Sequence, residues 1–486
     1  MDTKTEIIQA EFAADKQSPT LQSLEDTEAH SEVSVDYAGA SRKTDPAEIA
    51  LVRKLDMCMM PFLWILCFMN IFNRQAISVA RLDSLEEDLG INDTQFSTAV
   101  SVHYASYIMG QIPSNLLLTR VRPSWYICGA MAVTSITTML DVFVVNNTGL
   151  ILQRFFLGII AAPYYPGAMY MISLFYKRKE IATRISILFS ANILATAFQG
   201  LIAAPIYSEL GGVRGLSGWR WMYLIMGSLS LFFSIVGVFF FPNKPTTTWW
   251  LTPAQKQLAA ERIAADTVEK KEDVNLLKGL RECLRDRRVW VFMVSQHLQT
   301  ATSSFRIFLP TLIDTLGFSR TVTLVLTCPP YILAGMSSIL AGLSSGRFNE
   351  RTWHITVIKS ISILGFVLAC AATNTGARYF AAFVFVAATY PVSPLNLSWT
   401  GITCGQTSEK RAASLAAVNT LSSVSLVWTP YLWPDSAAPR YVLPMAASAG
   451  MCFATIALSW YMRWDLMREN KRIRLGDNQT KIFYAY

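Results

Sequence analysis

The sequence predicts an all-α polytopic membrane protein with twelve transmembrane helices in two six-helix bundles. Of its 486 residues, 52% are hydrophobic and only 16% are charged, which is too little polar side chain to cover soluble domains. The hydrophobic residues fall into runs of about 20, the length that a helix needs to cross the hydrocarbon core of a bilayer. These runs must be helical, because lipid offers backbone N–H and C=O groups no hydrogen-bonding partner.

The order of the runs predicts five segments. Residues 1–57 are acidic and rich in Ser and Thr, cannot bury enough apolar area to offset their chain entropy, and are expected to form a disordered N-terminal tail. Residues 58–241 hold six hydrophobic runs, and residues 289–462 hold six more. Between them lies a polar linker, 242–288, in which Thr252 and Pro253 are expected to begin a helix. Residues 463–486 form a C-terminal tail.

The positions of Lys and Arg predict the orientation. The loops after the second, fourth, eighth and tenth runs are basic, and basic loops mark the cytoplasmic side. We therefore expect the linker and both termini in the cytoplasm. The first outer loop is acidic, and the outer loops hold two Asn-x-Ser/Thr sequences, at Asn92 and Asn146, which are candidate sites of a glycoprotein. The net charge of +8 does not indicate nucleic-acid binding, because the basic residues lie beside hydrophobic runs.

The sequence gives no sign of catalysis. The eight cysteines are scattered without CxxC or Cys/His spacing, so we expect no metal site. Nucleophile motifs, His/Asp pairs at helix ends and phosphate-binding glycine loops are absent from the sequence. We therefore expect neither an enzyme nor a cofactor.

Three arginines fall inside predicted spans, where a charge is costly unless it faces a cavity or a partner. Arg74 shares a helical stripe with Asn70, four residues earlier, which suits the wall of a central cavity. Structural pairing is the alternative for Arg74. Arg154 lies early in the fourth span, on the helical face that also carries Tyr165. Its alternatives are snorkelling to the surface or pairing with Asp141.

Arg306 is the third intramembrane arginine. It follows Gln299, Thr302 and Ser303 on one face of the seventh span. A role in binding and snorkelling to the outer surface both remain open for this side chain.

Motifs along nearly all of the chain after residue 50 identify a family. They are Phe72 to Gln75, Leu85 to Gly90, Ser101 to Asn115, Arg154 with Gly158, Pro166 and Gly167, Phe308 to Thr311, Leu316 with Gly317, Leu326 to Tyr331, Ser398 with Trp399, and Lys410 with Arg411. In this order they resemble the fungal allantoate permease family, in the anion:cation symporter branch of the major facilitator superfamily. The resemblance implies the major facilitator fold, the fungal plasma membrane and a small organic anion as substrate. Two parallel halves around a cytoplasmic linker also suit a transporter with a midplane site.

The resemblance also implies roles for individual residues. Arg74 and Arg154 are expected to grip the substrate carboxylate, which matches the bidentate fork of a guanidinium group. The family usually has no arginine at position 306, so Arg306 is expected to tune substrate choice. The complete expected substrate-binding set is Arg74, Arg154, Arg306, Asn70, Asn73 and Tyr165.

Proton coupling is the open question. Where the family carries proton-coupling carboxylates, this sequence has the neutral residues Asn73, Gln111 and Ala161. His103 could carry a proton instead, because imidazole titrates near neutral pH; the alternative is a hydrogen-bonded packing residue.

We expect a monomeric secondary active transporter or facilitator of a carboxylate, vitamin-like acid or acidic metabolite, acting by alternating access and using protons if it is a symporter. The first alternative is an exporter of an acidic secondary metabolite that is not coupled to protons. The second is a nutrient sensor that signals through its tails without transport.

Overall fold

A computed structural model describes residues 45–118, 121–266, 276–348, 350–404 and 408–475. Most of the expected N-terminal tail, up to residue 44, and the end of the C-terminal tail, from residue 476, lie outside the described residues. The chain divides into two units, 1–52 and 53–486. Of the first unit, only the beginning of one helix is described, and everything below concerns the second unit.

Every regular element in the described residues is helical. The first half (N half, 53–241) contains α3 (Pro46–Gln75, which begins in the first unit), α4 (Ile77–Ala80), α5 (Leu85–Leu89), α6 (Asp93–Leu118), α7 (Pro123–Met139), η1 (Leu140–Phe143), α8 (Asn147–Ala161), α9 (Tyr164–Phe175), α10 (Arg178–Leu210), η2 (Val213–Gly215) and α11 (Gly218–Phe240). The linker contains η3 (Pro245–Thr247), α12 (Pro253–Asp266) and α13 (Leu276–Arg285). As the sequence predicts, Thr252 and Pro253 mark the beginning of α12.

The second half (C half, 287–475) contains α14 (Arg287–Thr302), α15 (Phe305–Asp314), α16 (Arg320–Leu326), α17 (Cys328–Phe348), α18 (Thr352–Ala371), α19 (Thr375–Thr389), α20 (Val392–Thr403), α21 (Ser408–Trp428), η4 (Thr429–Leu432), η5 (Asp435–Ala437) and α22 (Val442–Leu475). Prolines interrupt equivalent helices of the two halves. Pro163 lies between α8 and α9, and Pro391 lies between α19 and α20. The helices are interrupted there because proline lacks the backbone N–H that would continue the hydrogen-bonding pattern.

Ten helical segments of the described residues are long and apolar enough to cross a membrane. The second and seventh expected spans, α6 and the pair α14 and α15, are not among them. Both carry many polar residues, and α14 ends where Ser303 and Ser304 break the helix before α15. These two segments supply Val100, His103, Tyr104 and Ile307 to the cavity described below.

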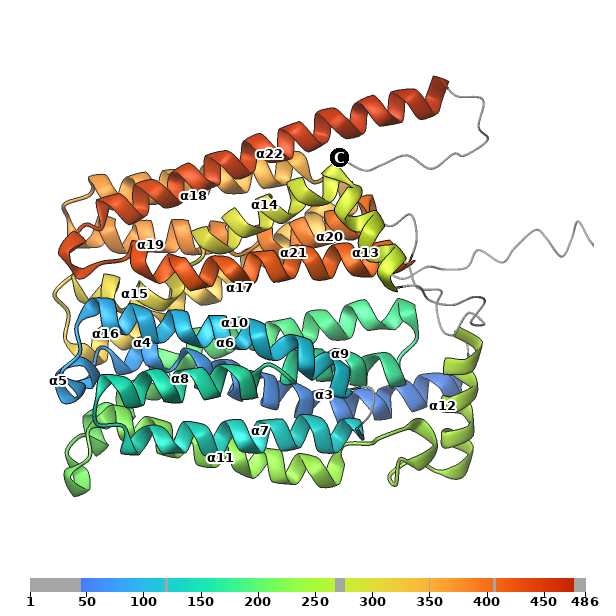
Figure 1. The fold of residues 1–486 in the computed structure, drawn as a ribbon, viewed down its shortest axis with the longest axis horizontal. Coiled ribbons are helices and arrows are strands. Elements are labelled where there is room, and N and C mark those ends of the chain that lie inside the picture. Colours follow the sequence, from blue (N-terminus) through green and yellow to red (C-terminus); the bar gives the residue numbers. More distant parts are fainter. Residues whose placement is uncertain (1–44, 119–120, 267–275, 349, 405–407, 476–486) are drawn as a thin grey trace, which may run out of the picture. The chain divides into compact units, whose positions relative to one another are not determined.

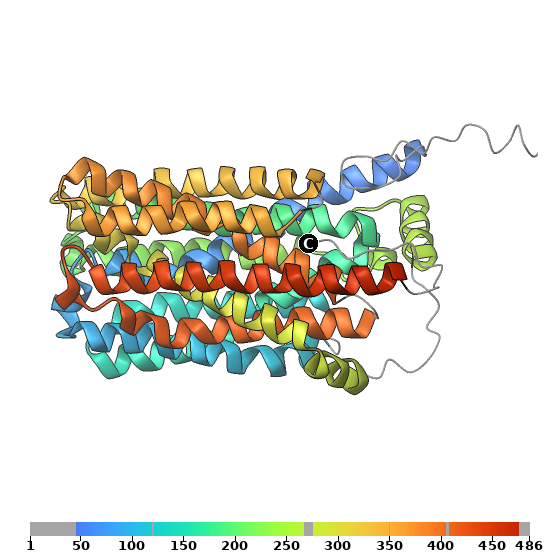
Figure 2. The same cartoon turned by 90° about the horizontal axis from the view of Figure 1, so that it is seen from above.

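The long helices of residues 53–486 run side by side along one direction, whereas α12 of the linker lies across that direction (Figure 1); Figure 2 shows the same arrangement from a second side. In the N half α7 packs on α11 and α6 on α8, whereas in the C half α18 packs on α22 and α14 on α21. The halves meet where α10 packs against α16 and α17, and where α6 packs against α21. We call the end with residues 81–93, 315–320 and 433–440 the gate end, and the end with the linker the linker end.

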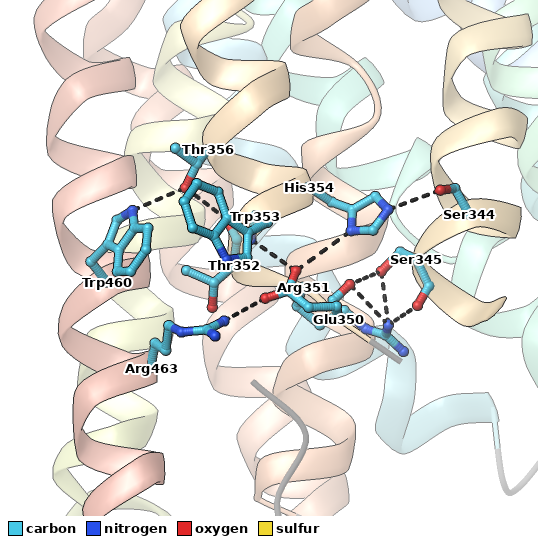
Figure 3. A network of polar contacts seen from close by, with 10 residues as sticks. All are labelled: Ser344, Ser345, Glu350, Arg351, Thr352, Trp353, His354, Thr356, Trp460 and Arg463. Carbon is cyan, nitrogen blue, oxygen red and sulfur yellow. Dashed lines mark hydrogen bonds and ion pairs between the residues drawn. The ribbon is translucent and has the colours of Figure 1, made fainter. Parts of the chain in front are cut away.

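A polar network fastens three C-half helices near the linker end (Figure 3). Glu350 forms an ion pair with Arg463 of α22 at 2.6 Å and accepts a hydrogen bond from the Trp353 backbone N–H of α18 at 2.9 Å. His354 lies 3.6 Å from Glu350 and 2.9 Å from the Ser344 hydroxyl of α17. The network therefore ties α17, α18 and α22 together.

Candidate substrate site

A small cavity lies between the halves, on the gate-end side of the bundle. It is lined by Arg74, Gln75, Ile77, Val100, His103, Tyr104, Arg154 and Ile307. In this conformation it has room for about one water molecule. Seven of these residues come from the N half, and Ile307 on α15 comes from the C half. The structure thus brings together three of the residues that the sequence singles out: Arg74, His103 and Arg154.

The guanidinium group of Arg154 has one nitrogen with a hydrogen-bonding partner and two without. The residue is only 1% exposed, and its Nη2 donates a hydrogen bond to the Tyr223 hydroxyl of α11 at 2.6 Å. Its Nε and Nη1 are buried without a hydrogen-bonding partner. Unpaired donors on a buried guanidinium are costly, and an anion in the cavity would satisfy them.

Arg74 lies on α3 across the cavity from α8. Its Nε is also buried without a hydrogen-bonding partner, and its guanidinium carbon lies 5.5 Å from the ring centre of Tyr107. Neither Arg74 nor Arg154 is within ion-pair distance of a carboxylate among the described residues. Two arginines of the N half therefore line one cavity, and neither forms an ion pair with the described residues.

Arg306 approaches the same cavity from the C half. Arg306 does not line the cavity itself. Its Nη2 donates a hydrogen bond of 3.4 Å to the hydroxyl of Tyr104, which does line the cavity. Its Nε has no hydrogen-bonding partner, and like the other two arginines it forms no ion pair within the described residues. Arg306 is therefore one contact away from the cavity, on α15.

His103 stands on α6 between these groups. It is 2% exposed, and neither ring nitrogen makes a hydrogen bond to the described residues. The close packing of α6 on α8 fixes its position, because a Cβ at Gly158 would lie 2.4 Å from the His103 backbone oxygen and 2.0 Å from the Ser106 hydroxyl. Only glycine fits at position 158 without moving α6.

The remaining expected site residues lie elsewhere. Asn70 donates to the Met131 sulfur of α7 at 3.4 Å, and Asn73 donates to the Ser230 hydroxyl of α11 at 3.4 Å, so both amides face helices of the N half. Tyr165 is not among the residues that line the cavity.

Asn92 and Asn146, the candidate glycosylation sites, are exposed at the gate end. The side chain of each accepts a hydrogen bond at a helix start, from the Gln95 and Gly149 backbone N–H groups at 2.9 and 2.8 Å. Both asparagines therefore act as helix caps.

One acidic side chain is buried near the cavity. Asp141 of η1 is 1% exposed and accepts a hydrogen bond from Gln153 Nε2 at 2.7 Å. It is near enough to interact electrostatically with Arg154, but it does not pair with it directly. Asp141 therefore leaves the Nε and Nη1 donors of Arg154 without a partner.

Ion pairs between the halves close the gate end. The Arg81 side chain, 4% exposed, pairs with Glu86 at 2.8 Å and Asp93 at 3.1 Å in the N half and with Asp435 of the C half at 2.6 Å. Its guanidinium carbon also lies 4.5 Å from the ring centre of Phe96. One buried cation therefore collects carboxylates from both halves.

A second pair joins Arg320 of the C half to Asp83 of the N half at 2.6 Å. Asp83 also accepts from the Trp219 backbone N–H at the start of α11, at 2.8 Å. Burial raises the pKa of the Asp83, Glu86 and Asp435 carboxyls, and the neighbouring arginines offset this only in part.

Sequence reasoning missed three residues of this region. Tyr104 and Tyr223 contact Arg306 and Arg154, but no spacing rule links residues on different helices. Arg81 follows the first predicted span and reads as an ordinary loop charge. The acidic residues of the first outer loop, which include its partners Glu86 and Asp93, could have indicated that Arg81 forms ion pairs there.

The comparisons with known proteins agree with this architecture. Residues 63–430 match the Major Facilitator Superfamily. An uncharacterised transporter of Schizosaccharomyces pombe is 30% identical over 428 residues, 87% of each chain, and the pantothenate transporter liz1 of the same organism is 24% identical over 463 residues, 90% of this chain and 86% of the relative. The crystal structure of a bacterial homologue of the human lysosomal transporter Spinster superposes with a TM-score of 0.67 at 15% identity, covering 88% of this chain and 99% of that one. The chain therefore belongs to the Major Facilitator Superfamily and is a multi-pass membrane transporter, not an enzyme.

Proposed function

We propose that the protein transports a small organic anion by alternating access, with Arg74 and Arg154 as the ligands of its carboxylate. The observation that carries this proposal is the set of buried guanidinium donors that face the cavity without a partner. A carboxylate fits such donors in shape and charge. The similarity to a pantothenate transporter supports the same substrate class, because pantothenate carries a carboxylate.

The gate end is proposed to face the outside of the fungal plasma membrane, with the linker and both termini in the cytoplasm. The acidic loop at the gate end and the basic loops at the linker end support this orientation. Opening the Arg81 and Arg320 ion pairs would then expose the cavity to the outside, and closing them would commit the bound anion to the inside.

Uptake by the purified full-length chain in liposomes tests this function. Radiolabelled carboxylates, aromatic and aliphatic, are offered with and without an inward proton gradient. We expect saturable uptake of at least one carboxylate, and loss of that uptake in Arg74→Gln and Arg154→Gln. Arg468→Gln is the matched control, because Arg468 stacks on Trp464 far from the cavity. Normal uptake in both cavity variants would contradict the assigned roles.

A second candidate is an exporter or facilitator that is not coupled to protons. The neutral Asn73, Gln111 and Ala161 at the usual carboxylate positions favour it. In the same assay, this candidate predicts that the radiolabelled carboxylate equilibrates across the membrane and that the proton gradient does not change its uptake. Accumulation driven by the gradient, and lost in His103→Ala, would instead support His103 as the proton carrier.

A further inference from the structure

The charges around the cavity divide between the two halves. The N half contributes Arg74 and Arg154, and the buried Asp141 interacts electrostatically with Arg154. Neither Arg74 nor Arg154 forms an ion pair with a carboxylate of the described residues, so the N half presents at least one uncompensated positive charge to the cavity. The C half contributes Arg306, which forms no ion pair with the described residues and contacts the N half through the 3.4 Å hydrogen bond from its Nη2 to the Tyr104 hydroxyl. One positive charge of the C half is uncompensated as well.

Three of the side chains that line the cavity are aliphatic. Ile77 and Val100 of the N half and Ile307 of the C half line the cavity between the arginines. These three side chains suit methylene groups of a ligand, whereas Gln75, His103 and Tyr104 of the same lining offer polar contacts. A ligand that contacts the arginines of both halves must carry two negatively charged ends, and methylene groups between them would contact the aliphatic side chains.

We propose that the transported anion is a short aliphatic dicarboxylate that bridges the halves. One carboxylate binds Arg74 and Arg154, and the other displaces the Tyr104 hydroxyl from Arg306. A monoanion leaves one half with a buried, uncompensated charge, which opposes closure around it. This inference rests on the proposed organic-anion function and names its substrate class. Phosphate carries two charges but has no methylene chain to contact Ile77, Val100 and Ile307.

Binding to the purified full-length protein in detergent tests the proposal. The ligands are the straight-chain dicarboxylates from malonate to adipate, each beside its monomethyl ester, which has the same chain and one charge fewer. Measurements at about pH 7.5 keep every free carboxyl ionised. The readout is the ligand-dependent shift in melting temperature, from which a dissociation constant is fitted. Inorganic phosphate is a further arm.

We expect at least one dicarboxylate to bind about tenfold more tightly than its half-ester, because it gains a charged hydrogen bond. In Arg306→Gln this ratio should fall towards one through weaker dicarboxylate binding, with half-ester binding unchanged. The control Arg468→Gln should keep the full ratio.

Other results overturn the proposal in distinguishable ways. Binding of half-esters or monocarboxylates as tight as that of any dicarboxylate refutes the dianion but leaves the organic-anion function standing. Binding of phosphate without any dicarboxylate refutes the carboxylate chemistry. If the affinity ratio of dicarboxylate to half-ester is unchanged in Arg306→Gln, Arg306 does not bind the second carboxylate. Failure of every carboxylate to bind refutes both the inference and the proposed function.

Discussion

Arg81 and Asp435 are 354 residues apart in sequence, yet their side chains meet at 2.6 Å and join the end of the first transmembrane segment to the loop before α22. Because Arg81 is buried and also holds Glu86 and Asp93, the pair is the centre of the closed gate end. The cavity with Arg74 and Arg154 lies on the same side of the bundle. In this conformation the gate therefore separates that cavity from the solution beyond the gate end.

Removing Arg81 should open the gate end. Arg81→Gln leaves Glu86, Asp93 and Asp435 close together without their cation, so they repel each other. Ser97→Cys reports opening, since Ser97 is buried and its hydroxyl donates to the Pro430 carbonyl of the C half at 3.3 Å. We expect maleimide labelling of this cysteine to be about tenfold faster in Arg81→Gln. The half-buried Cys58 and Cys370 are replaced by Ser in every variant.

The control for this experiment is Arg214→Gln, at an exposed position of the same end. It should label at the unmodified rate. Equal labelling rates in the Arg81 and Arg214 variants would mean that Arg81 does not hold the gate.

Acidification should favour the closed gate. Burial raises the pKa of Asp83, Glu86 and Asp435 in this conformation, whereas an open gate returns them to water and to ordinary pKa values. Closure therefore takes up protons. The resulting stabilisation of the closed state is complete below the ordinary pKa near 4 and is lost as the pH rises through the raised values.

Asp88 should not contribute to this dependence. Hydrogen bonds from Ser217, Trp219 and Ser84 outweigh the effect of burial and lower its pKa, but all three donors belong to the N half and stay with it.

The measurement for the pH dependence of the gate is the labelling rate of Ser97→Cys divided by that of the exposed Ser208→Cys, which cancels the ionisation of the thiol. The ratio should rise with pH, and this rise should shrink in Asp83→Asn combined with Asp435→Asn. A ratio that falls with pH would contradict the account.

A side chain at Gly200 should separate the halves. A Cβ there would lie 2.1 Å from the Leu324 backbone oxygen and 2.5 Å from the Thr327 hydroxyl, across the contact of α10 with the C half. Gly200→Ala should therefore speed Ser97→Cys labelling. Gly342→Ala is the matched control, because a Cβ at Gly342 meets nothing within 4 Å. Alanine should be neutral there or stabilise the helix by about 0.5–1 kcal/mol. Similar labelling in both variants would count against close approach at Gly200.

Tyr223 should act on binding through Arg154. Its hydroxyl accepts the 2.6 Å hydrogen bond that orients the guanidinium, so Tyr223→Phe should weaken anion binding about fivefold. Tyr170→Phe serves as the control. The dissociation constant and the melting temperature are measured together, because a purely structural defect would lower stability without a selective loss of affinity. Unaltered affinity in Tyr223→Phe would show that Arg154 needs no such orientation.

The membrane class and helical fold were predictable because runs of about 20 apolar residues are a local signal. Local pattern also singled out Arg74, His103 and Arg154, since polar groups inside apolar runs stand out. Asn70 shows the limit of that reasoning. It shares a stripe with Arg74, but the packing of α3 turns its amide towards Met131 of α7 instead of the cavity.

The parts that the sequence did not reveal depend on pairs of distant residues. Arg154 with Tyr223 and Arg81 with Asp435 are each made by two helices or loops whose registers are set only by the packed bundle. Gly158 has a similar role, because its lack of a side chain matters only once α6 lies against α8.

Equilibrium binding to Arg74→Gln, beside wild type and Arg468→Gln, of a carboxylate that the wild-type protein takes up in liposomes tests the proposed substrate site most directly. Arg74 keeps an unpaired buried donor at the cavity, and its removal should weaken binding at least about tenfold, since a charged hydrogen bond is lost. Arg468→Gln should bind as wild type does. Equal affinity in all three proteins would contradict the claim that this cavity binds the anion.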